Sequence, residues 1–354
     1  MRLSERKIRN YLDGKDDAAL FAEADRVRRE VFGEGVYLRG ILEFSNYCRR
    51  NCLYCGLRRD NRQIVRYRLS TAEILDGVAE IAAAGVKTVV LQTGEDPFYS
   101  AREIARIITA IKSRYEIAVT LSLGERSRET YRLWREAGAD RYLLRMETFN
   151  RDNYARVRPQ RVWEKRLECL ESLREMDYEV GSGIMVGLPG DEFEDIVTAV
   201  RGLTRLQLDM IGTGPFIAHP RTPFADQPDG NIDLTLRVYA LLRILNPLAN
   251  IPSTSAMESA RPGGRMRGLQ VGANVIMPSF TPPRVRELYN IYPGKNVQRD
   301  IDDNYSSALA MIVKAGYRAD FARGDSPVKS NKDKVQSVKV KVEGRVISEN
   351  EPAR

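Results

Sequence analysis

Short apolar runs recur along the chain and alternate with longer segments whose apolar residues are spaced as on one face of a helix. The strand-like runs lie at 36–44, 87–92, 117–123, 141–146, 180–187, 209–217, 251–256 and 273–277. The helix-like segments lie at about 101–114, 127–137, 161–176, 192–206, 233–246 and 262–270. A capping box from Ser70 to Glu73 opens one more helix, which ends near Gly85.

This alternation predicts an α/β fold with a parallel sheet and right-handed crossovers. Eight strand–helix units predict a closed (β/α)8 TIM-type barrel, whose active site lies at the carboxyl ends of its strands. Two charged helices over residues 3–32 come before the barrel. We therefore divide the chain into an N-terminal helical cap (1–34), a barrel (35–317), and a linker with a short C-terminal extension (318–354).

The last part of the chain has a different character from the barrel. Residues 323–334 have the composition of a linker. Residues 338–347 alternate as in a short hairpin. This part carries no candidate chemistry, and it reads either as an appended edge element or as a disordered tail.

Composition and charge narrow the setting. The chain has 354 residues, of which 43% are hydrophobic, enough for a full core. No apolar run approaches the roughly 20 residues of a membrane span, and the first residues begin no secretory signal. The net charge of +8 would fit nucleic-acid binding, but arginines with acidic neighbours, as at 173–175, favour a solvated surface. The low number of cysteines, four, predicts a protein of the reducing cytoplasm. From the charge pattern and the absence of a long apolar run, we predict no nucleic-acid or membrane partner.

Three of the four cysteines, Cys48, Cys52 and Cys55, follow the first predicted strand with the spacing C-x3-C-x2-C. An ordinary four-iron cluster takes four cysteine thiolates, so three leave one iron open to a small molecule. A structural zinc site needs four Cys or His ligands, and the only histidine, His219, is distant in the sequence. A disulfide framework needs paired cysteines. The spacing therefore favours one cluster with an open iron.

Polar residues also follow other predicted strands, where the barrel would place its active site. Residues 93–97 follow the second strand and would also suit a plain turn. The fourth strand places Arg141, Arg145 and Glu147 on one face by alternation. Charges inside a barrel need partners, which are either charged ligands or each other. His219 lies between prolines and reads as a loop-shaping residue rather than an acid or base.

The cysteine motif resembles the signature of the radical S-adenosylmethionine (SAM) enzymes. Within them, the chain is similar to the HydE family of FeFe-hydrogenase maturases over about residues 36–295. The resemblance is carried by residues 43–46, 56–61, 91–97, 137–145, 187–190 and 288–295. Methylornithine synthase and biotin synthase are more distant relatives with the same barrel plan.

The resemblance implies one 4Fe-4S cluster on the three cysteines and SAM as cofactors, with reductive cleavage to a 5′-deoxyadenosyl radical. It also implies a set of SAM-binding residues. These are Tyr54 and Met185 beside adenine, Thr93, Gly94 and Glu95 near the amino group, Glu147, and Arg166 on the carboxylate, with Ser122 at the mouth of the third strand.

The resemblance further implies a small carboxylate-bearing, cysteine-like substrate, which in HydE is a cysteine-ligated iron carbonyl-cyanide unit. Its carboxylate would be held by Arg141, Thr254, Ser255, Tyr289 and Tyr292. Arginine suits this role because its planar fork binds a carboxylate through two parallel hydrogen bonds. The implied protein partners are a one-electron donor such as flavodoxin or ferredoxin, and other maturases.

The chain departs from the HydE pattern at two points. The C-terminal cysteines that hold a second cluster in some HydE proteins are missing, but that cluster is a variable feature. Met146, where HydE sequences commonly have histidine, is the departure that keeps alternatives open. One alternative is a HydE-like paralogue that acts on another amino acid, such as a mutase resembling methylornithine synthase. The other is a non-enzymatic iron–sulfur or nucleic-acid-binding protein.

Overall fold

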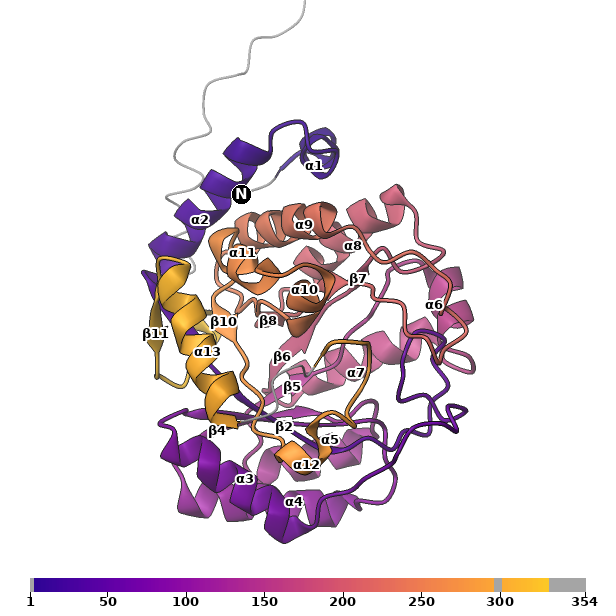
Figure 1. Cartoon of the computed structure of the whole chain (residues 1–354), viewed down its shortest axis with the longest axis vertical. Helices are drawn as coiled ribbons and strands as arrows, with labels where there is room; N and C mark the ends of the chain where they lie inside the picture. The colour runs from indigo at the N-terminus through magenta and orange to yellow at the C-terminus, as the bar shows by residue number, and fades with distance from the viewer. Residues whose placement is uncertain (1–2, 296–300, 331–354) are drawn as a thin grey trace, which may run out of the picture.

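The computed structural model describes residues 3–295 and 301–330 (Figure 1). Its main sheet has six parallel strands in the order β2-β3-β4-β5-β6-β8. These strands are β2 (Gly40–Ser45), β3 (Thr88–Thr93), β4 (Ala118–Ser122), β5 (Arg141–Leu143), β6 (Glu179–Ser182) and β8 (Met210–Ile211). Two shorter strands, β7 (Met185–Val186) and β9 (Gly214–Pro215), pair with each other.

The sheet closes into a barrel through the two remaining strand positions. The backbone N–H of Ile211 donates to Asn250 O, and that of Asn274 donates to Ile251 O, both at 2.9 Å. Strand β10 (Val275–Ile276) then pairs in parallel with β1 (Gly35–Leu38). The predicted (β/α)8 barrel is therefore confirmed. The first strand of the barrel is divided between β1 and β2. The seventh strand is represented by two single β-bridges, from Asn250 to Met210 and from Pro252 to Val275.

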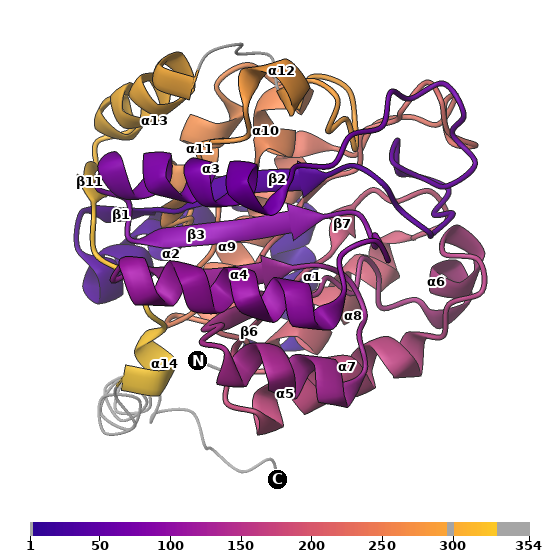
Figure 2. The same cartoon turned by 90° about the horizontal axis from the view of Figure 1, so that it is seen from below.

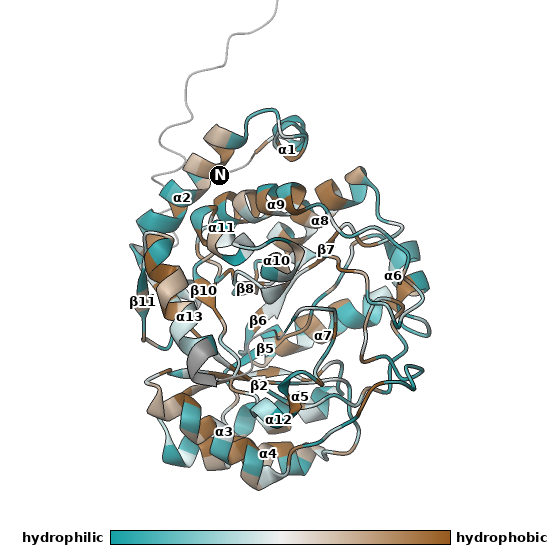
Figure 3. Ribbon diagram, viewed as in Figure 1, coloured by the Kyte–Doolittle hydropathy of each residue, from teal (hydrophilic) through white to brown (hydrophobic). Residues whose placement is uncertain are grey.

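Helices cover the outside of the barrel (Figures 1 and 2). The predicted helical segments match α4 (Ala101–Arg114), α5 (Arg128–Glu136), α7 (Trp163–Glu175), α8 (Phe193–Arg205), α9 (Ile232–Leu245) and α11 (Gly264–Gln270). The capping box at Ser70 and Glu73 opens α3 (Thr71–Ala83) as expected. In Figure 3 hydrophilic and hydrophobic residues alternate along α3 and α4, as in helices with one face on a sheet.

The N-terminal helices and several short helices complete the described chain. Helices α1 (Glu5–Leu12) and α2 (Asp17–Phe32) pack on α9, and α1 also contacts α8. The remaining helices are α6 (Arg151–Val157), α10 (Ser255–Ala260), α12 (Pro283–Arg286), α13 (Ile301–Lys314) and α14 (Pro327–Ser330). No helix within residues 3–295 and 301–330 is long and apolar enough to cross a bilayer.

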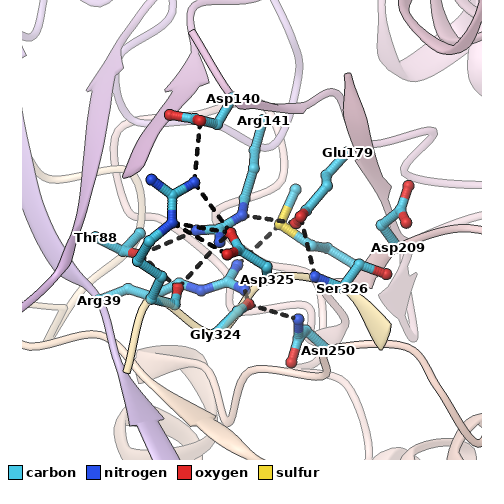
Figure 4. Close-up of polar contacts among 12 residues, drawn as sticks. Arg39, Thr88, Asp140, Arg141, Glu179, Asp209, Asn250, Gly324, Asp325 and Ser326 are labelled. Atoms are coloured by element: carbon cyan, nitrogen blue, oxygen red, sulfur yellow. Dashed lines mark hydrogen bonds and ion pairs between the residues drawn. The ribbon is translucent and has the colours of Figure 1, made fainter. Parts of the chain in front are cut away.

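The segment after α13 closes the amino end of the barrel. Strand β11 (Arg318–Asp320) pairs in parallel with β1, and the chain then crosses beneath the strands. The carbonyl of Gly324 accepts hydrogen bonds from Arg39 Nη2 and Asn250 Nδ2, both at 3.1 Å (Figure 4). The N–H of Ser326 donates to Glu179 Oε1 at 2.9 Å. The division at residue 318 is therefore corrected, because residues 318–326 belong to the barrel. The hairpin predicted at 338–347 lies outside the described residues.

Arg141 is part of this closure. Its side chain is fully buried at the start of β5. Nε donates to Glu179 Oε2 at 2.6 Å, Nη1 to Thr88 Oγ1 at 2.9 Å, and Nη2 to Asp325 Oδ1 at 2.6 Å (Figure 4). Its guanidinium is thus held by protein partners at the end of the barrel opposite the expected active site. The prediction that Arg141 binds the substrate carboxylate is corrected on this ground.

Replacing Arg141 with alanine is expected to lower the free energy of unfolding by roughly 3–5 kcal/mol, because the buried Glu179 carboxylate loses its cation. Urea unfolding measures the change. Arg114→Ala, at an exposed position on α4, is the control and should change stability by less than about 0.5 kcal/mol. An Arg141→Ala protein that is as stable as the wild type but fails to bind substrate would return Arg141 to the substrate pocket.

Candidate active site at the carboxyl ends of the strands

The carboxyl ends of the strands surround a cavity of about 320 Å³. This is the end of the barrel at which enzymes of this architecture place their active sites. Most of the residues singled out in the sequence line it: Cys48, Cys52, Tyr54, Cys55, Thr93, Glu95, Ser122, Glu147, Arg166, Met185, Thr254, Ser255 and Tyr292. Three of the predicted site residues do not line the cavity: Gly94, Tyr289 and Arg141.

The cysteines lie on the loop that leaves β2. Cys52 is buried, and Cys48 and Cys55 are partly buried. The Sγ of Cys48 accepts backbone hydrogen bonds from Arg50 (3.4 Å) and Glu95 (3.3 Å). Gly94 permits this approach of the loop after β3, because a Cβ at Gly94 would lie only 2.8 Å from the Cβ of Cys48. The hydrogen bonds to sulfur are of the kind that tunes iron–sulfur clusters.

The three thiols suit a shared cationic centre. Burial raises the pKa of Cys55 far above its usual value, and the neighbouring Cys52 and Cys48 raise it further. Burial also raises the pKa of Cys48. Iron bound at this loop would stabilise the thiolate forms. Among the described residues, no three His, Cys, Asp or Glu side chains gather around the position of one metal ion. A four-iron cluster does not need this, because each thiolate binds a different iron.

Glu147 adopts an unusual backbone conformation beside the cavity. Its φ is 71°, a left-handed value that is strained for a residue other than glycine. The segment from Gly183 to Met185, which leads into β7, holds this conformation. Glu147 N–H donates to Gly183 O (3.0 Å), and Glu147 O accepts from Met185 N–H (2.9 Å). The carboxylate is 3.2 Å from Arg145 Nη2. Among the described residues its Oε2 accepts no aligned hydrogen bond, so it retains acceptor capacity toward a ligand.

Several cationic side chains line the cavity, and most of them are paired with carboxylates. Besides Arg145 and the predicted Arg166, the cavity wall contains Arg50, Arg158 and Lys295. Lys295 is paired with Glu43, and Arg50 is paired with Glu95. Arg166 lies 3.0 Å from Glu125 and donates to Tyr154 Oη at 3.2 Å, while Arg158 donates to Tyr54 Oη at 3.3 Å. Such a wall suits an anionic ligand, including the carboxylate of SAM.

Arg145 and three hydroxyl side chains form a receptor of the kind that was expected around Arg141. Arg145 Nη2 donates to Ile184 O at 2.5 Å, but among the described residues its buried Nε has no aligned partner. Ser255 Oγ and Tyr292 Oη are 2.6 Å apart, and Thr254 Oγ1 donates to a backbone carbonyl. Burial raises the pKa of Tyr292 to about 12, which keeps its hydroxyl a donor at neutral pH. A guanidinium with an unused donor beside neutral hydroxyls can bind a carboxylate.

Tyr289 lies behind this receptor rather than in the cavity wall. Its hydroxyl accepts from Gln92 Nε2 at 3.1 Å, and the Nζ of Lys295 is 4.8 Å from its ring centroid. Gln92 and Lys295 both line the cavity. Tyr289 therefore positions two wall residues, and it does not itself reach the cavity.

Two further residues from the sequence are structural. Met146 is fully buried in the main hydrophobic core, and it is absent from the cavity lining. His219 is also buried, and its Nδ1 accepts from the N–H of Arg221 at 3.0 Å. A Cβ on Gly56 would lie 2.4 Å from His219 Nε2, so the imidazole packs directly on the cysteine loop. These contacts agree with the loop-shaping interpretation of His219.

Comparison with known proteins gives consistent matches. The family model of the radical SAM superfamily matches residues 42–203. The chain is 52% identical over 277 residues to the [FeFe] hydrogenase maturase subunit HydE of Thermotoga maritima, covering 78% of this chain and 79% of that protein. It is 28% identical over 297 residues to 3-methylornithine synthase of Methanosarcina acetivorans, covering 83% and 82%.

Solved structures of similar proteins share the fold. The crystal structure of methylornithine synthase (PylB) matches with a TM-score of 0.80 at 25% identity and covers 92% of this chain and 95% of that one. The FeFe-hydrogenase maturase HydG of Carboxydothermus hydrogenoformans matches with a TM-score of 0.75 at 22% identity, covering 91% and 76%. The second likeness supports the barrel fold alone.

The strain at Glu147 and the ligand role of its carboxylate can be separated by two substitutions. Glu147→Gly and Glu147→Ala both remove the carboxylate, and both should weaken SAM binding at least about tenfold, as expected when a charged hydrogen-bond partner is lost. Glycine adopts φ of 71° without strain, so Glu147→Gly should be more stable than Glu147→Ala by roughly 1 kcal/mol. Equilibrium binding and thermal unfolding measure the two effects. Wild-type SAM affinity in both variants would remove Glu147 from the SAM site.

Proposed function

The chain belongs to the radical SAM superfamily, and we propose that within it this enzyme acts as a HydE-type maturase on a small, carboxylate-bearing, cysteine-like substrate. As a member of this superfamily, it is a SAM-dependent enzyme with a 4Fe-4S cluster. The proposal concerns the substrate and the pathway. It is supported by the 52% identity to HydE and, in the structure, by the Arg145 receptor in the same cavity as the three cysteines.

The chain's own residues have distinct tasks in this scheme. When bound at Cys48, Cys52 and Cys55, the cluster supplies the electron that splits SAM into methionine and an adenosyl radical. Glu147 and Arg166 orient SAM, and Tyr54 and Met185 pack beside its adenine.

Arg145 places the substrate next to SAM. It lies two residues before Glu147, and the two side chains are in contact at 3.2 Å. A carboxylate held by Arg145 therefore lies beside the group that orients SAM. Such positioning brings the reacting atoms together without further loss of freedom. Ser255 and Tyr292 would complete the hydrogen bonds to the carboxylate and fix its direction.

A mutase resembling methylornithine synthase is the second candidate. It is favoured by the TM-score of 0.80 over 92% of the chain. A carboxylate receptor does not separate the two functions, because amino acids carry the same group. Met146 does not separate them either, because it lies in the core and not in the cavity wall.

Formation of 5′-deoxyadenosine with defined substrates tests the proposal. Reconstituted protein, SAM and dithionite are incubated with a cysteine-bound iron carbonyl-cyanide compound or with each of the free amino acids, and Cys52→Ser serves as the inactive control. A strong increase with the iron compound alone, together with complementation of a HydE deletion alongside the other maturases, is the expected result. An increase and a rearranged product with a free amino acid alone would favour the mutase.

Substitutions at the receptor should separate substrate binding from SAM cleavage. Tyr292→Phe and Arg145→Met each remove a proposed donor to the carboxylate, and Arg145→Met removes a charged one. The expected loss in substrate affinity is about fivefold for Tyr292→Phe and about 10- to 150-fold for Arg145→Met. Cleavage of SAM without substrate should stay within about twofold for Tyr292→Phe, which does not contact Glu147.

The measurement is substrate titration against 5′-deoxyadenosine formation, with Thr130→Val as the control. Thr130 lies on α5, outside the cavity wall. If both receptor variants keep wild-type substrate affinity, the carboxylate binds elsewhere in the cavity.

A further inference from the structure

The cysteine loop is rich in arginine. Residues 49–68 contain seven arginines and one acidic residue, Asp60, which gives this stretch a net charge of +6. Glu95 and Asp96 of the loop after β3 pair with Arg50 and Arg68 and lower the local charge to +4, against +8 for the whole chain. Figure 2 shows that the loop after β2 projects beyond the ends of β2 and β3. Three of its arginines, Arg49, Arg59 and Arg62, are exposed, so the projecting loop presents positive charge to solvent.

Apolar side chains are exposed on the same surface. Val65 is 65% exposed and Phe98 is 59% exposed. The guanidinium of Arg68, which is paired with Asp96, lies 3.7 Å from the ring centroid of Tyr47 and 4.4 Å from that of Phe98. We call this surface the arginine face, defined by Arg49, Arg59, Arg62, Val65, Arg68 and Phe98. Aromatic residues and arginine are enriched at protein–protein interfaces, where apolar contacts lie within a polar rim.

The arginine face lies directly outside the cluster ligands. Tyr47, whose ring lies against Arg68, is the residue immediately before Cys48. Arg49 follows Cys48 and is exposed. The loop is held in place by Arg66, which donates to Leu57 O at 3.0 Å and to Arg58 O at 2.8 Å. A protein bound on this face would therefore contact the residues on either side of Cys48 in the sequence.

We propose that the arginine face docks an acidic one-electron carrier protein and that the electron enters through Tyr47 and Cys48. This inference rests on the proposed function, since it requires a cluster that is reduced in each turnover. In the step, the reduced carrier loses one electron and the cluster gains one, and no bond or proton is exchanged. Exposed arginines attract an acidic partner and speed its association, whereas Val65 and Phe98 supply the apolar contact that a phosphate backbone does not need.

Charge reversal on the arginine face tests the inference. Arg59→Glu/Arg62→Glu reverses two exposed charges that are not part of the cavity wall. Arg6→Glu/Lys7→Glu makes the same change of charge on α1, which packs against α8 and α9, and serves as the control. The measurement is the rate of 5′-deoxyadenosine formation at low salt, either with limiting reduced flavodoxin of acidic surface or with dithionite.

With flavodoxin, the arginine-face variant should be slower by roughly tenfold or more, and added salt should slow the wild type. With dithionite, which needs no docking, all variants should stay within about twofold of the wild type. Phe98→Ala, which changes no charge, should also slow only the flavodoxin reaction. If both double variants respond equally to flavodoxin, the inference is overturned. A wild type that is inactive even with dithionite would instead overturn the proposed function.

Nucleic acid is the other class of anionic macromolecule that such a surface could attract. Binding of the wild-type holoenzyme to single-stranded RNA and double-stranded DNA is measured at physiological salt. Under the inference, neither binds tightly, and the flavodoxin rate depends on the arginines. Tight nucleic-acid binding that is lost in Arg59→Glu/Arg62→Glu, with an unchanged flavodoxin rate, would overturn it.

Discussion

The site depends on closure of the parallel sheet between its first and last strands. Ile41 makes this seam: its N–H donates to Pro278 O at 2.9 Å, and its carbonyl accepts from Phe280 N–H at 2.8 Å. The seam brings the segment after the eighth strand against the cysteine loop, where Gly56 N–H donates to Ile291 O at 3.0 Å. Without closure, the thiols and Tyr292 would lie on opposite edges of an open sheet. With closure, residues about 240 positions apart in sequence share one cavity.

Arg141 and Arg145 show how depth in the barrel decides the role of a charge. They lie four residues apart, which corresponds to roughly 13 Å along an extended chain. Arg141 meets Glu179, Thr88 and Asp325 and is fully occupied at the closed amino end. Arg145 reaches the cavity with a donor unused among the described residues. A buried charge whose donors are all used supports the fold, and one with a donor left over is available to a ligand.

Alternation of apolar residues was enough to predict the barrel, because each strand and helix buries one face and carries that period in its own residues. It gives the face of a side chain but not its depth, so it did not separate Arg141 from Arg145. It also missed residues 323–326, whose attachment depends largely on the backbone groups of Arg323, Gly324 and Ser326. Every residue except proline carries the same backbone donor and acceptor, so the sequence of residues 323–326 does not reveal these hydrogen bonds. The spacing of the three cysteines, by contrast, was enough to predict an iron–sulfur cluster with one open iron.

Two sets of arginines on neighbouring parts of the same end serve different ligands because their solvent exposure differs. Arg145 and Arg166 line the cavity and are mostly buried, so salt screens their charges little and geometry selects a small carboxylate. Arg59 and Arg62 are exposed, so their field reaches farther into solution but weakens with ionic strength. The first set can fix a substrate, and the second can only guide and hold a large partner. Because the first set lines the cavity and the second does not, an electron carrier and a substrate would not compete for one surface.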